Sequence, residues 1–467
     1  MPAVRWSTTM IAVAATVLGA LAGAARAATV PPDLRAAAGT GTWGTAQEVP
    51  GTANLNRGGD ATVNSVSCAS AGNCAADGYY SDGSGNQQAF VASQVYGTWH
   101  TAVEVPGTAA LNRGGDAEVN SVSCASAGNC SAGGYYENGT GAYQALVVNE
   151  VHGVWQPAIK TPGTATLNKG GDAKVLSVSC ASAGNCSAGG YYVDASSHWQ
   201  AFVANEVHGT WQPAIEVPGT AALNQAWVAR VSTVSCASAG NCSAGGFYSD
   251  SRGYTQAFVV NEVNGTWQPA IEVPGTAALN RYGTAQVLSV SCASAGNCSA
   301  GGSIADSYPF VVNEVNGTWQ PAILVSGTAF VHLWTAQVTS VSCASAGNCG
   351  AGGSYTDTSG FSHAFVVNKL GGTWQPAIEL PGAQVQSMSC ASAGNCAAVG
   401  GASDYTPTQA FVVSEVNGKW LTLMHVPGAS GVSAVNSVSC SGVSECSAGG
   451  YYTDISARNQ AFVLSDS

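Results

Sequence analysis

Short apolar segments bounded by turn-forming residues recur along the whole chain. One copy begins Val175-Leu-Ser-Val-Ser-Cys180, continues through Ala-Ser-Ala-Gly-Asn, and resumes as Cys186-Ser-Ala-Gly-Gly-Tyr-Tyr192. After a loop of variable sequence, the same copy gives Gln200-Ala-Phe-Val-Ala-Asn-Glu-Val207, the turn His208-Gly209, and Thr210-Trp211-Gln-Pro-Ala-Ile-Glu-Val217. Short segments rich in Val, Phe, Tyr and Trp are typical of β-strands. The pattern therefore predicts four strands in each copy.

The apolar pattern differs between the strands of one copy, and the difference predicts how the copies pack. The third strand is apolar at consecutive positions, as in Ala257-Phe-Val-Val260, which suits a strand that is covered on both faces. The second strand contains small residues, as in Ala188-Gly-Gly190, and these would let a neighbouring sheet approach closely. We therefore expect the sheets to stack face to face.

Sixteen cysteines mark the period of this repeat. They form eight pairs of the pattern C-x5-C, and the first cysteines of successive pairs are 56, 56, 56, 56, 51, 47 and 50 residues apart. Four-stranded units of this length predict an all-β fold, an eight-bladed β-propeller with four-stranded antiparallel blades. A linear β-solenoid is the alternative, but its coils are shorter. The pairs are Cys68/Cys74, Cys124/Cys130, Cys180/Cys186, Cys236/Cys242, Cys292/Cys298, Cys343/Cys349, Cys390/Cys396 and Cys440/Cys446.

The even number of cysteines and their constant spacing predict one disulfide in each unit. Each pair would bracket the turn between the first and second strands, where directly opposed residues point to the same face of the sheet. Zinc is the alternative, but structural zinc sites favour roughly two to four residues between cysteines and need four ligands together. The seven histidines do not follow the cysteine pairs. We therefore expect disulfides and no metal.

The two ends of the chain complement one another. A tryptophan marks each fourth strand, and the first of these precedes every cysteine pair, whereas the last unit stops after its third strand, Gln460-Ala-Phe-Val-Leu464. Residues 41–49 therefore predict the missing fourth strand of the last blade, which closes the ring and removes the exposed edges of an open array. The fourth-strand tryptophans are Trp43, Trp99, Trp155, Trp211, Trp267, Trp319, Trp374 and Trp420.

The composition excludes several classes of protein. Fifty-nine glycines and seventeen prolines in 467 residues argue against an all-helical fold. Charged residues make up 9% of the chain and its net charge is −12, which is the wrong sign for binding nucleic acid or an anionic membrane surface. Few charges also mean that Ser, Thr, Asn, Gln and the backbone must hydrate the surface.

The N-terminal residues have the pattern of an export signal. A basic residue precedes an apolar stretch, residues 10–25, and a site with small residues at its first and third positions ends at Ala27. We expect residues 1–27 to be a signal peptide, residues 28–39 a linker and residues 40–467 the propeller. An uncleaved anchor is the alternative, but the stretch is shorter than the roughly 20 residues of a membrane-spanning helix. We expect the mature chain to be secreted, monomeric and without a membrane span.

The third turn of the units resembles a degenerate Asp-box, the repeat of bacterial neuraminidases (BNR). The resemblance rests on Val263-Asn-Gly-Thr-Trp267 and Ser414-Glu-Val-Asn-Gly-Lys-Trp420, or about seven residues per copy. The Asp position holds Val or another residue here, and the spacing to Trp is one residue shorter. With their C-x5-C pairs, the whole units look like those of secreted bacterial propeller proteins. That family's catalytic arginine cluster and Tyr/Glu pair have no match in this chain, so sialidase activity does not carry over.

Variable loops carry the candidate binding residues. In a propeller, the loops after the second and fourth strands open on one face, opposite the turns that hold the cysteines. Aromatic and amide residues at these positions would supply flat apolar area for stacking and donors that fix a ligand's orientation. Unselected variation of the loops is the alternative. The candidate ligand-binding residues are Tyr143, Trp199, Trp227, Tyr254, Tyr282 and Trp334.

Two further polar patterns have a structural interpretation. His152 and His208 occupy third turns in which other copies use Asn or Gly, so we interpret them as turn residues rather than catalytic groups. An aspartate or asparagine also stands eight residues after the second cysteine of every copy, and we interpret it as the start of an Asx-turn. The alternative is a ring of acceptors for sugar hydroxyls or Ca2+. These residues are Asp82, Asn138, Asp194, Asp250, Asp306, Asp357, Asp404 and Asp454.

The chain contains no nucleophile elbow, no phosphate-binding glycine loop and no cluster of His, Asp and Glu in sequence. The pattern therefore favours a secreted, non-enzymatic binding module for a glycan or a surface protein, and it gives no reason to expect a cofactor. One alternative is an extracellular glycoside hydrolase or lyase, because paired carboxylates from different blades leave no trace in sequence spacing. Another is a structural envelope protein.

Overall fold

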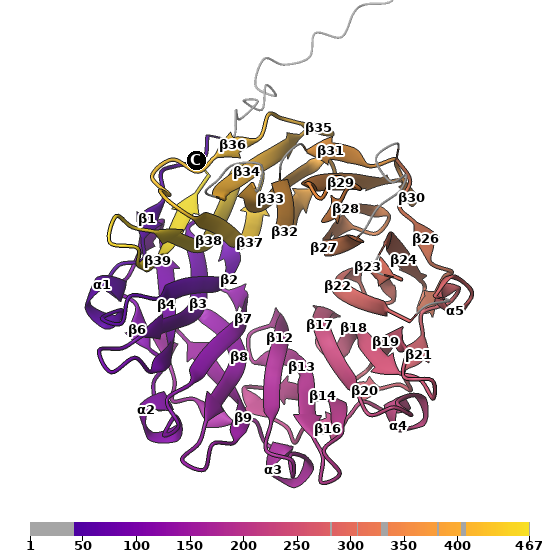
Figure 1. Ribbon diagram of the computed structural model, residues 1–467, viewed down its shortest axis with the longest axis horizontal. Helices are drawn as coiled ribbons and strands as arrows, with labels where there is room; N and C mark the ends of the chain where they lie inside the picture. The colour runs from indigo at the N-terminus through magenta and orange to yellow at the C-terminus, as the bar shows by residue number, and fades with distance from the viewer. Residues whose placement is uncertain are drawn as a thin grey trace, which may run out of the picture. The chain divides into compact units, whose positions relative to one another are not determined.

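Each repeat forms one antiparallel sheet, and the eight sheets are arranged as the blades of a ring in the computed structural model (Figure 1). The structure describes residues 42–280, 283–305, 307–327, 335–380, 383–402 and 408–466. They belong to one unit, Gly39–Ser467. The expected signal peptide, residues 1–27, and linker, residues 28–39, lie outside the described residues. The prediction of an eight-bladed, all-β propeller is confirmed.

Three long strands form the inner part of every blade. The first strands line the middle of the ring (Figure 1): β2 (Ala61–Ser70), β7 (Ala117–Ser126), β12 (Ala173–Ser182), β17 (Ala229–Ser238), β22 (Ala285–Ser294), β27 (Thr335–Ser345), β32 (Ala383–Ser392) and β37 (Ser433–Gly442). The second strands are β3 (Asn73–Ser81), β8 (Asn129–Glu137), β13 (Asn185–Val193), β18 (Asn241–Ser249), β23 (Asn297–Ile304), β28 (Asn348–Thr356), β33 (Asn395–Ala402) and β38 (Glu445–Thr453). The third strands are β4 (Gln87–Val95), β9 (Tyr143–Val151), β14 (Trp199–Val207), β19 (Thr255–Val263), β24 (Tyr308–Val315), β29 (Ser362–Leu370), β34 (Gln409–Val416) and β39 (Asn459–Ser465).

The fourth strand is divided into two short segments that both pair with the third strand. In five blades a proline follows the first segment by two residues, as Pro213 follows Trp211, and a residue without an N–H group cannot continue the ladder. Blades 1 to 7 have β5 (Thr98–Trp99) and β6 (Val103–Glu104), β10 (Val154–Trp155) and β11 (Ile159–Lys160), β15 (Thr210–Trp211) and β16 (Ile215–Glu216), β20 (Thr266–Trp267) and β21 (Ile271–Glu272), β25 (Thr318–Trp319) and β26 (Ile323–Leu324), β30 (Thr373–Trp374) and β31 (Ile378–Leu380), and β35 (Lys419–Trp420) and β36 (Met424–His425).

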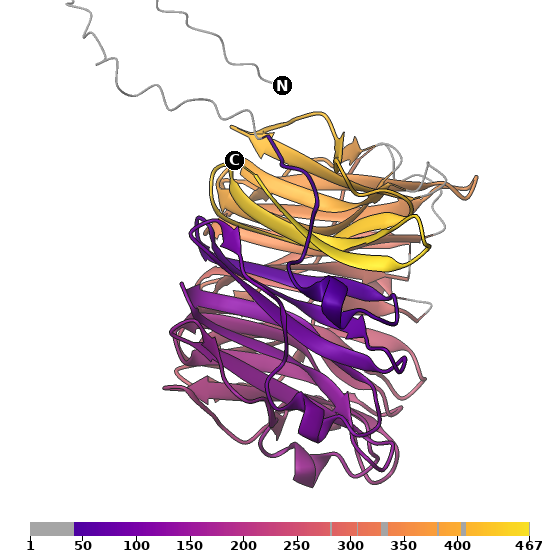
Figure 2. The same ribbon diagram turned by 90° about the vertical axis from the view of Figure 1, so that its left-hand side faces the viewer.

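The N-terminal segment completes blade 8, as the sequence predicts. Strand β1 (Gln47–Glu48) pairs antiparallel with β39, and Trp43 forms a bridge with Asp466. Figure 2 shows this segment running beside the C-terminal strands before it enters blade 1. The Trp43 indole N–H donates to Ser414 Oγ of blade 7 at 3.0 Å, so the closing strand also joins two blades.

The hydrophobic core lies between neighbouring blades. Its largest fully buried side chains are phenylalanines of the third strands, such as Phe202 and Phe258. The small residues of the second strand allow close packing, because a Cβ atom added at Gly189 would lie 2.5 Å from Val231 Cγ1 of the next blade. The expectation that small residues let the sheets approach one another is therefore confirmed.

Hydrogen bonds from one first strand to the next run around the whole ring. Between blades 3 and 4, the backbone N–H groups of Val234 and Cys236 donate to Ser177 Oγ and Ser179 Oγ at 3.0 and 2.9 Å. Every junction has such a pair, including the closing one, where Ser437 accepts from Val66. The repeated serines, with Thr233 in one of their places, thus satisfy backbone donors that the sheet itself leaves unpaired.

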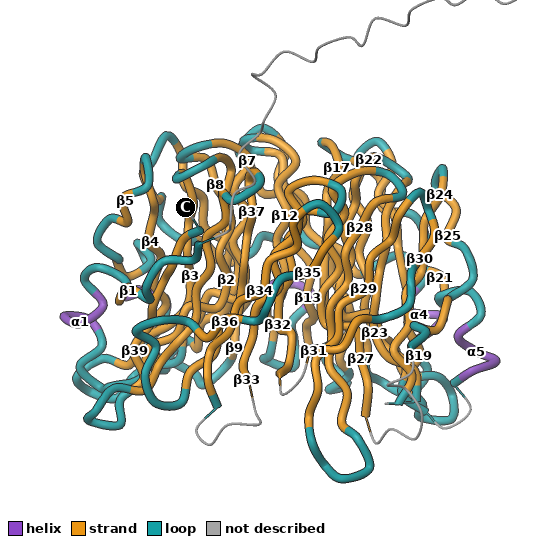
Figure 3. The backbone as a smooth tube through the Cα atoms, turned by 90° about the horizontal axis from the view of Figure 1, so that it is seen from above, coloured by secondary structure: helices purple, strands orange, loops and turns teal. Residues whose placement is uncertain are grey.

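The strands run between two faces of the ring (Figure 3). The turn face holds the disulfide turns between first and second strands and the turns after the third strands. The two kinds of turn touch, since the backbone N–H of Gly209 donates to the carbonyl oxygen of Gly184 at 2.8 Å. The loop face holds the loops after the second strands and the connections to the next blade. All eight predicted disulfides form, each across directly opposed residues such as Cys180 and Cys186.

The second cysteine of a pair also contacts the neighbouring blade, which the spacing of the pair does not predict. The predicted disulfide itself forms within each hairpin. In five blades, however, the buried Sγ atom of the second cysteine meets a serine hydroxyl from the second strand of the preceding blade. The Sγ–Oγ distances are 3.6 Å for Cys74 and Ser447, 3.3 Å for Cys186 and Ser131, 3.3 Å for Cys242 and Ser187, 3.3 Å for Cys298 and Ser243, and 3.6 Å for Cys349 and Ser299. The disulfides therefore also belong to the packing between blades.

Candidate functional site

Asx-turns shape the loops after the second strands. Asp194 Oδ1 accepts from the backbone N–H groups of Ser196 and His198 at 2.7 and 3.0 Å. The equivalent turn forms at Asp82, Asn138, Asp250, Asp357 and Asp454, whereas Asp306 and Asp404 lie outside the described residues. The interpretation as Asx-turns is confirmed for the described positions. These Asp and Asn side chains hold the loop together and present the residue at its end, here His198, on the loop face.

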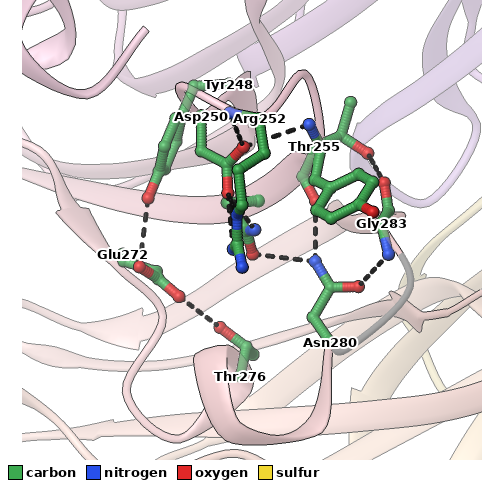
Figure 4. A network of polar contacts seen from close by, with 10 residues as sticks. Tyr248, Asp250, Arg252, Thr255, Glu272, Thr276, Asn280 and Gly283 are labelled. Atoms are coloured by element: carbon green, nitrogen blue, oxygen red, sulfur yellow. Dashed lines mark hydrogen bonds and ion pairs between the residues drawn. The ribbon is translucent and has the colours of Figure 1, made fainter. Parts of the chain in front are cut away.

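The connections between blades are equally well held. Among the described residues, five connections contain a four-residue helix: α1 (Thr52–Leu55), α2 (Thr108–Leu111), α3 (Thr164–Leu167), α4 (Thr220–Leu223) and α5 (Thr276–Leu279). In blade 4, Asn280 follows the helix and donates to the carbonyl oxygen of Thr255 at 2.8 Å, while its own Oδ1 accepts from Gly283 N–H (Figure 4). In the same blade, Glu272 accepts from the Thr276 and Tyr248 hydroxyls. The connection is therefore a fixed part of the loop face.

Blades 2 and 3 bring tyrosines and a lysine together on this face. Tyr143 contacts Tyr135 edge-to-face, with the ring centroids 5.5 Å apart. The Lys174 ammonium of blade 3 lies 3.6 Å from the Tyr135 ring centroid and 4.4 Å from that of Tyr143. The Tyr143 hydroxyl donates to Asp116 at 2.9 Å, and this bond, with burial, raises the pKa of Tyr143 to about 12. Both tyrosines are thus fixed in position.

Two tryptophans continue the cluster in blade 3. Trp199 stacks on Tyr191 with the ring planes 5° apart and the centroids at 4.4 Å. Trp227, in the connection to blade 4, stacks on His198 at 5.2 Å, and its carbonyl oxygen accepts from the Trp199 N–H at 2.9 Å. We call Tyr135, Tyr143, Lys174, Tyr191, Trp199 and Trp227 the aromatic surface.

Trp227 has a backbone conformation that bulky residues rarely adopt. Its φ is 79°, and the equivalent residues of four other connections are glycines with φ from 86° to 109°. A tryptophan in this region is strained by about 1–3 kcal/mol. Its side chain is nevertheless 60% exposed, so burial of the indole does not compensate the strain.

The six candidate residues of the sequence have different outcomes. Tyr143 lies on the same surface as Trp199 and Trp227, because Lys174 contacts its ring and pairs with Tyr191 across the sheet. Tyr254 belongs to the loop of blade 4, where the Arg252 guanidinium lies 5.1 Å from its ring centroid. Tyr282 and Trp334 lie outside the described residues. Tyr135 and Tyr191, which the sequence reasoning did not single out, lie on second strands and contact the half-buried rings of Tyr143 and Trp199. The sequence feature that could have identified them is the Tyr-Tyr pair near the end of several second strands.

The turn face carries a feature that sequence reasoning missed, a series of crevices between successive blades. The crevice between blades 2 and 3 has a volume of about 270 Å³, and those between blades 3 and 4, 4 and 5, and 5 and 6 have about 290, 270 and 290 Å³. Each lies between a disulfide turn and a turn that follows a third strand. The sequence feature that could have predicted these crevices is the repeated Asn-Glu-Val near the end of the third strands, which places a carboxylate at the same position of successive blades.

A buried carboxylate forms the inner wall of most of these crevices. Glu206 accepts from Asn149 Nδ2 at 2.5 Å and from Ser131 Oγ at 2.9 Å, both in the preceding blade. The Trp211 indole N–H donates to the same asparagine, Asn149 Oδ1, at 2.9 Å. Burial raises the pKa of Glu206 and of its equivalents, and the hydrogen bonds from neighbouring side chains oppose that shift. The network joins adjacent blades, so the repeated glutamates have a structural role.

The described residues offer no metal centre. Among them, no group of three or more His, Cys, Asp or Glu side chains is placed to hold an ion. His152 and His208 both have φ of 50° in two-residue turns, which confirms their interpretation as turn residues. Nor does the part of the chain that the structure describes include a helix with the length and apolar character of a membrane span.

Comparisons with known proteins support the fold alone. No protein-family model matches the chain, and no curated protein matches its sequence. The resemblance to Asp-box repeats therefore stays a prediction. The structure is similar to Sqt1 from Chaetomium thermophilum, with a TM-score of 0.52, 8% identity, and coverage of 90% of this chain and 97% of that one. Sqt1 bound to the N-terminus of the ribosomal protein L10 gives a TM-score of 0.47 at 9% identity, with coverage of 88% and 98%.

Proposed function

We propose that this chain is a non-enzymatic binding protein that holds a neutral glycan on its aromatic surface. The observation that carries the proposal is Trp227, an exposed indole on a backbone where other blades have glycine. Strain that contributes nothing to the core is typical of residues that serve a function. Trp227 lies beside Trp199, so the two rings offer a sugar apolar faces against which its C–H groups can pack.

The polar groups around these rings suit hydroxyl groups better than a charged ligand. Asp116 and Asp172 accept from the hydroxyls of Tyr143 and Tyr191 and keep further acceptor capacity. The Lys174 ammonium already contacts two tyrosine rings. Burial raises the pKa of Asp172, and the charge of Lys174 offsets only part of that rise. A neutral sugar needs acceptors and stacking area, and both are present here.

The proposal includes export of the chain. Eight disulfides favour an oxidising compartment, and residues 1–27 have the pattern of a signal peptide. We propose that the mature chain begins near Ala28 and is a secreted monomer of the kind of bacterial propeller protein that its C-x5-C units resemble. Sequencing the N-terminus of the exported chain tests this part, since an uncleaved Met1 would contradict it.

A glycan array followed by calorimetric titration of the best neutral oligosaccharide tests the binding function. Trp199→Thr and Trp227→Gly introduce residues that equivalent positions of other blades already have, namely Thr255 and Gly283. Each variant should fold and bind about 10-fold more weakly, because a lost stacking contact costs about 1.4 kcal/mol.

Tyr96→Asn is the matched control. Tyr96 is 90% exposed in a turn on the opposite face, where Asn264 and Asn316 are its equivalents, so binding should not change. A flat array, or equal affinity of the two tryptophan variants and the wild type, would contradict the proposal. Binding to a surface protein without binding to any glycan would also contradict the proposal, although the fold would be unaffected.

The same titration addresses the hydrolase alternative. The Tyr135 hydroxyl donates to Glu118 at 2.9 Å and lies 3.4 Å from Asp116 Oδ1, so two carboxylates do lie close together on the loop face. Glu118 also accepts from Asn64 and Gln87, so several donors of the protein hold it in place. We therefore expect the bound oligosaccharide to be recovered intact after prolonged incubation, whereas its cleavage would show an enzyme.

A further inference from the structure

The crevices of the turn face repeat so closely that a departure in one of them is conspicuous. The side chain that reaches from each third strand toward the preceding blade is a carboxylate in most blades. In blade 6 this position holds Lys369, which pairs with Cys349 across the sheet as Glu206 pairs with Cys186. The residues at this position in blades 1 to 7 are Gln94, Glu150, Glu206, Glu262, Glu314, Lys369 and Glu415.

Lys369 is a buried cation without a carboxylate partner in the described chain. It is 5% exposed, and its Nζ donates to Ser299 Oγ of blade 5 at 3.1 Å. An ammonium group has three donors, and a neutral hydroxyl satisfies one of them. The Trp374 ring, with its centroid 5.8 Å from Nζ, adds a weak cation–π contact but no counter-charge. Glu314 is the other titratable residue that lines this crevice, but its carboxylate accepts from Asn261 and Ser243 at the junction of blades 4 and 5.

The rim of the same crevice departs from the repeat as well. The turn that borders a crevice contributes His208, Asn264 or Asn316 in the three neighbouring cases. At the Lys369 crevice it contributes Gly371, which has φ of 55° like those residues but lacks a side chain. A Cβ atom added at Gly371 would meet nothing within 4 Å, so packing does not require glycine there.

The two departures change the crevice in complementary ways, because one reverses the charge of its wall and the other removes a side chain from its entrance. We propose that the crevice between blades 5 and 6 binds a carboxylate group, which forms a charge-assisted hydrogen bond with Lys369. The volume of about 290 Å³ holds a small acid or the terminal residue of a peptide. Such a ligand supplies the counter-charge that a buried ammonium otherwise lacks.

Titration of the full chain with N-acetylglycine, with N-acetylglycinamide as the uncharged comparison, tests this proposal. Lys369→Gln and Lys369→Glu introduce side chains that blades 1 and 3 already have, so both variants should fold. Each should lower the affinity for N-acetylglycine at least about 10-fold, because a hydrogen bond to a charged group is lost. Titration with acetylated tetraglycine in parallel identifies where the carboxylate comes from. Tighter binding of this peptide than of N-acetylglycine indicates that the ligand is the C-terminus of a peptide chain, whereas equal binding indicates a small acid.

Two further measurements separate a binding role from a structural one. Gly371→Asn restores the rim of the other crevices and should weaken binding while leaving the free energy of unfolding unchanged. Burial lowers the pKa of Lys369, so affinity should fall on raising the pH before an ordinary lysine would lose its proton. Glu206→Gln, at the crevice between blades 2 and 3, should leave affinity for N-acetylglycine as it is.

Three outcomes would overturn the proposal: no saturable binding of N-acetylglycine to the wild type, equal binding of the uncharged amide, or full affinity in Lys369→Gln. Because the aromatic surface lies on the opposite face, loss of glycan binding there leaves this test unaffected.

Discussion

At the scale of single residues, the structure departs from its repeat at a few positions, and each departure has a measurable cost or consequence. Trp227 and Asp77 occupy positions where most other blades have glycine, and Lys369 occupies a position where most have glutamate. In each case the usual residue is more compatible with the repeated structure. Such local conflicts are expected where function, rather than folding, selects the residue. Substitutions at these positions can therefore separate effects on binding from effects on stability.

Trp227→Gly should raise the free energy of unfolding by about 1 kcal/mol or more, because it removes backbone strain at a position with positive φ. Chemical denaturation of the full chain measures the change, and Trp199→Thr serves as a comparison without that strain. A drop in stability would mean that the stacking of Trp227 on His198 outweighs the strain.

Asp77 is a fully buried carboxyl group in the place where blades 2 to 6 have glycine. Neither of its oxygens makes a hydrogen bond of ordinary geometry, although the Ser65 backbone N–H lies near enough to oppose part of the pKa shift. Burial, and next the charge of Glu118, raise its pKa well above the usual value. A raised pKa contributes stability below the unfolded pKa of about 3.9, and this stability is lost as the pH rises through the folded pKa.

Asp77→Gly should therefore stabilise the chain by about 1–3 kcal/mol, since an unpaired buried polar group is removed. The gain should be smallest near pH 4 and grow toward neutral and alkaline pH. Urea denaturation of both chains at several pH values measures it. A gain that does not vary with pH would show that Asp77 titrates normally in the folded chain.

At the scale of elements, the short disulfide-closed hairpins are the best-defined units. Replacing Cys180 and Cys186 together by alanine should lower the free energy of unfolding by roughly 2 kcal/mol, as the chain-entropy model gives for so short a loop. Guanidinium denaturation measures this loss. A loss of more than about 5 kcal/mol would instead indicate that the sulfur atoms, through contacts such as that of Cys186 with Ser131, mainly support the packing between blades.

The strand pattern of each element was readable from the sequence because burial imposes it. Consecutive apolar residues in Ala257-Phe-Val-Val260 correspond to a strand packed on both faces, and small residues at Gly189 correspond to close contact with the next blade. The division of the fourth strand was not foreseen. The residue before its second half bonds outside its own blade, since the Ala214 N–H donates to the carbonyl oxygen of Pro162 in the preceding connection.

At the scale of the whole molecule, closure of the ring depends on the segment that contains Trp43 and β1. Deleting residues 1–49 should leave β39 with an unpaired edge and should lower stability by about 3–5 kcal/mol, from the loss of the buried Trp43 alone. Deleting residues 1–39 is the control and should leave the fold intact. Thermal unfolding and size-exclusion chromatography compare the two. Equal behaviour would show that the ring stays closed without this strand.

The sequence by itself determined the repeat, the strand order within a blade and the disulfide pairs. It also determined that the N-terminal segment supplies the fourth strand of the last blade. These features follow from local periodicity, from the number of units and from cysteine spacing, all of which can be read directly from the order of residues in the chain. The positions of the Asx-turns belong to the same class, because Asp194 bonds to its own loop.

Only the tertiary structure decided which side chains meet between blades. Ser437 accepts a hydrogen bond from Val66, 371 residues away, and Lys369 reaches Ser299, 70 residues away. The stacking of Trp227 on His198 likewise depends on how a connection docks against the blade it leaves. Such contacts are set by the angle and distance between whole sheets, which are the sum of many packing contacts. No spacing along the chain encodes them, and the two surfaces proposed for binding are made of them.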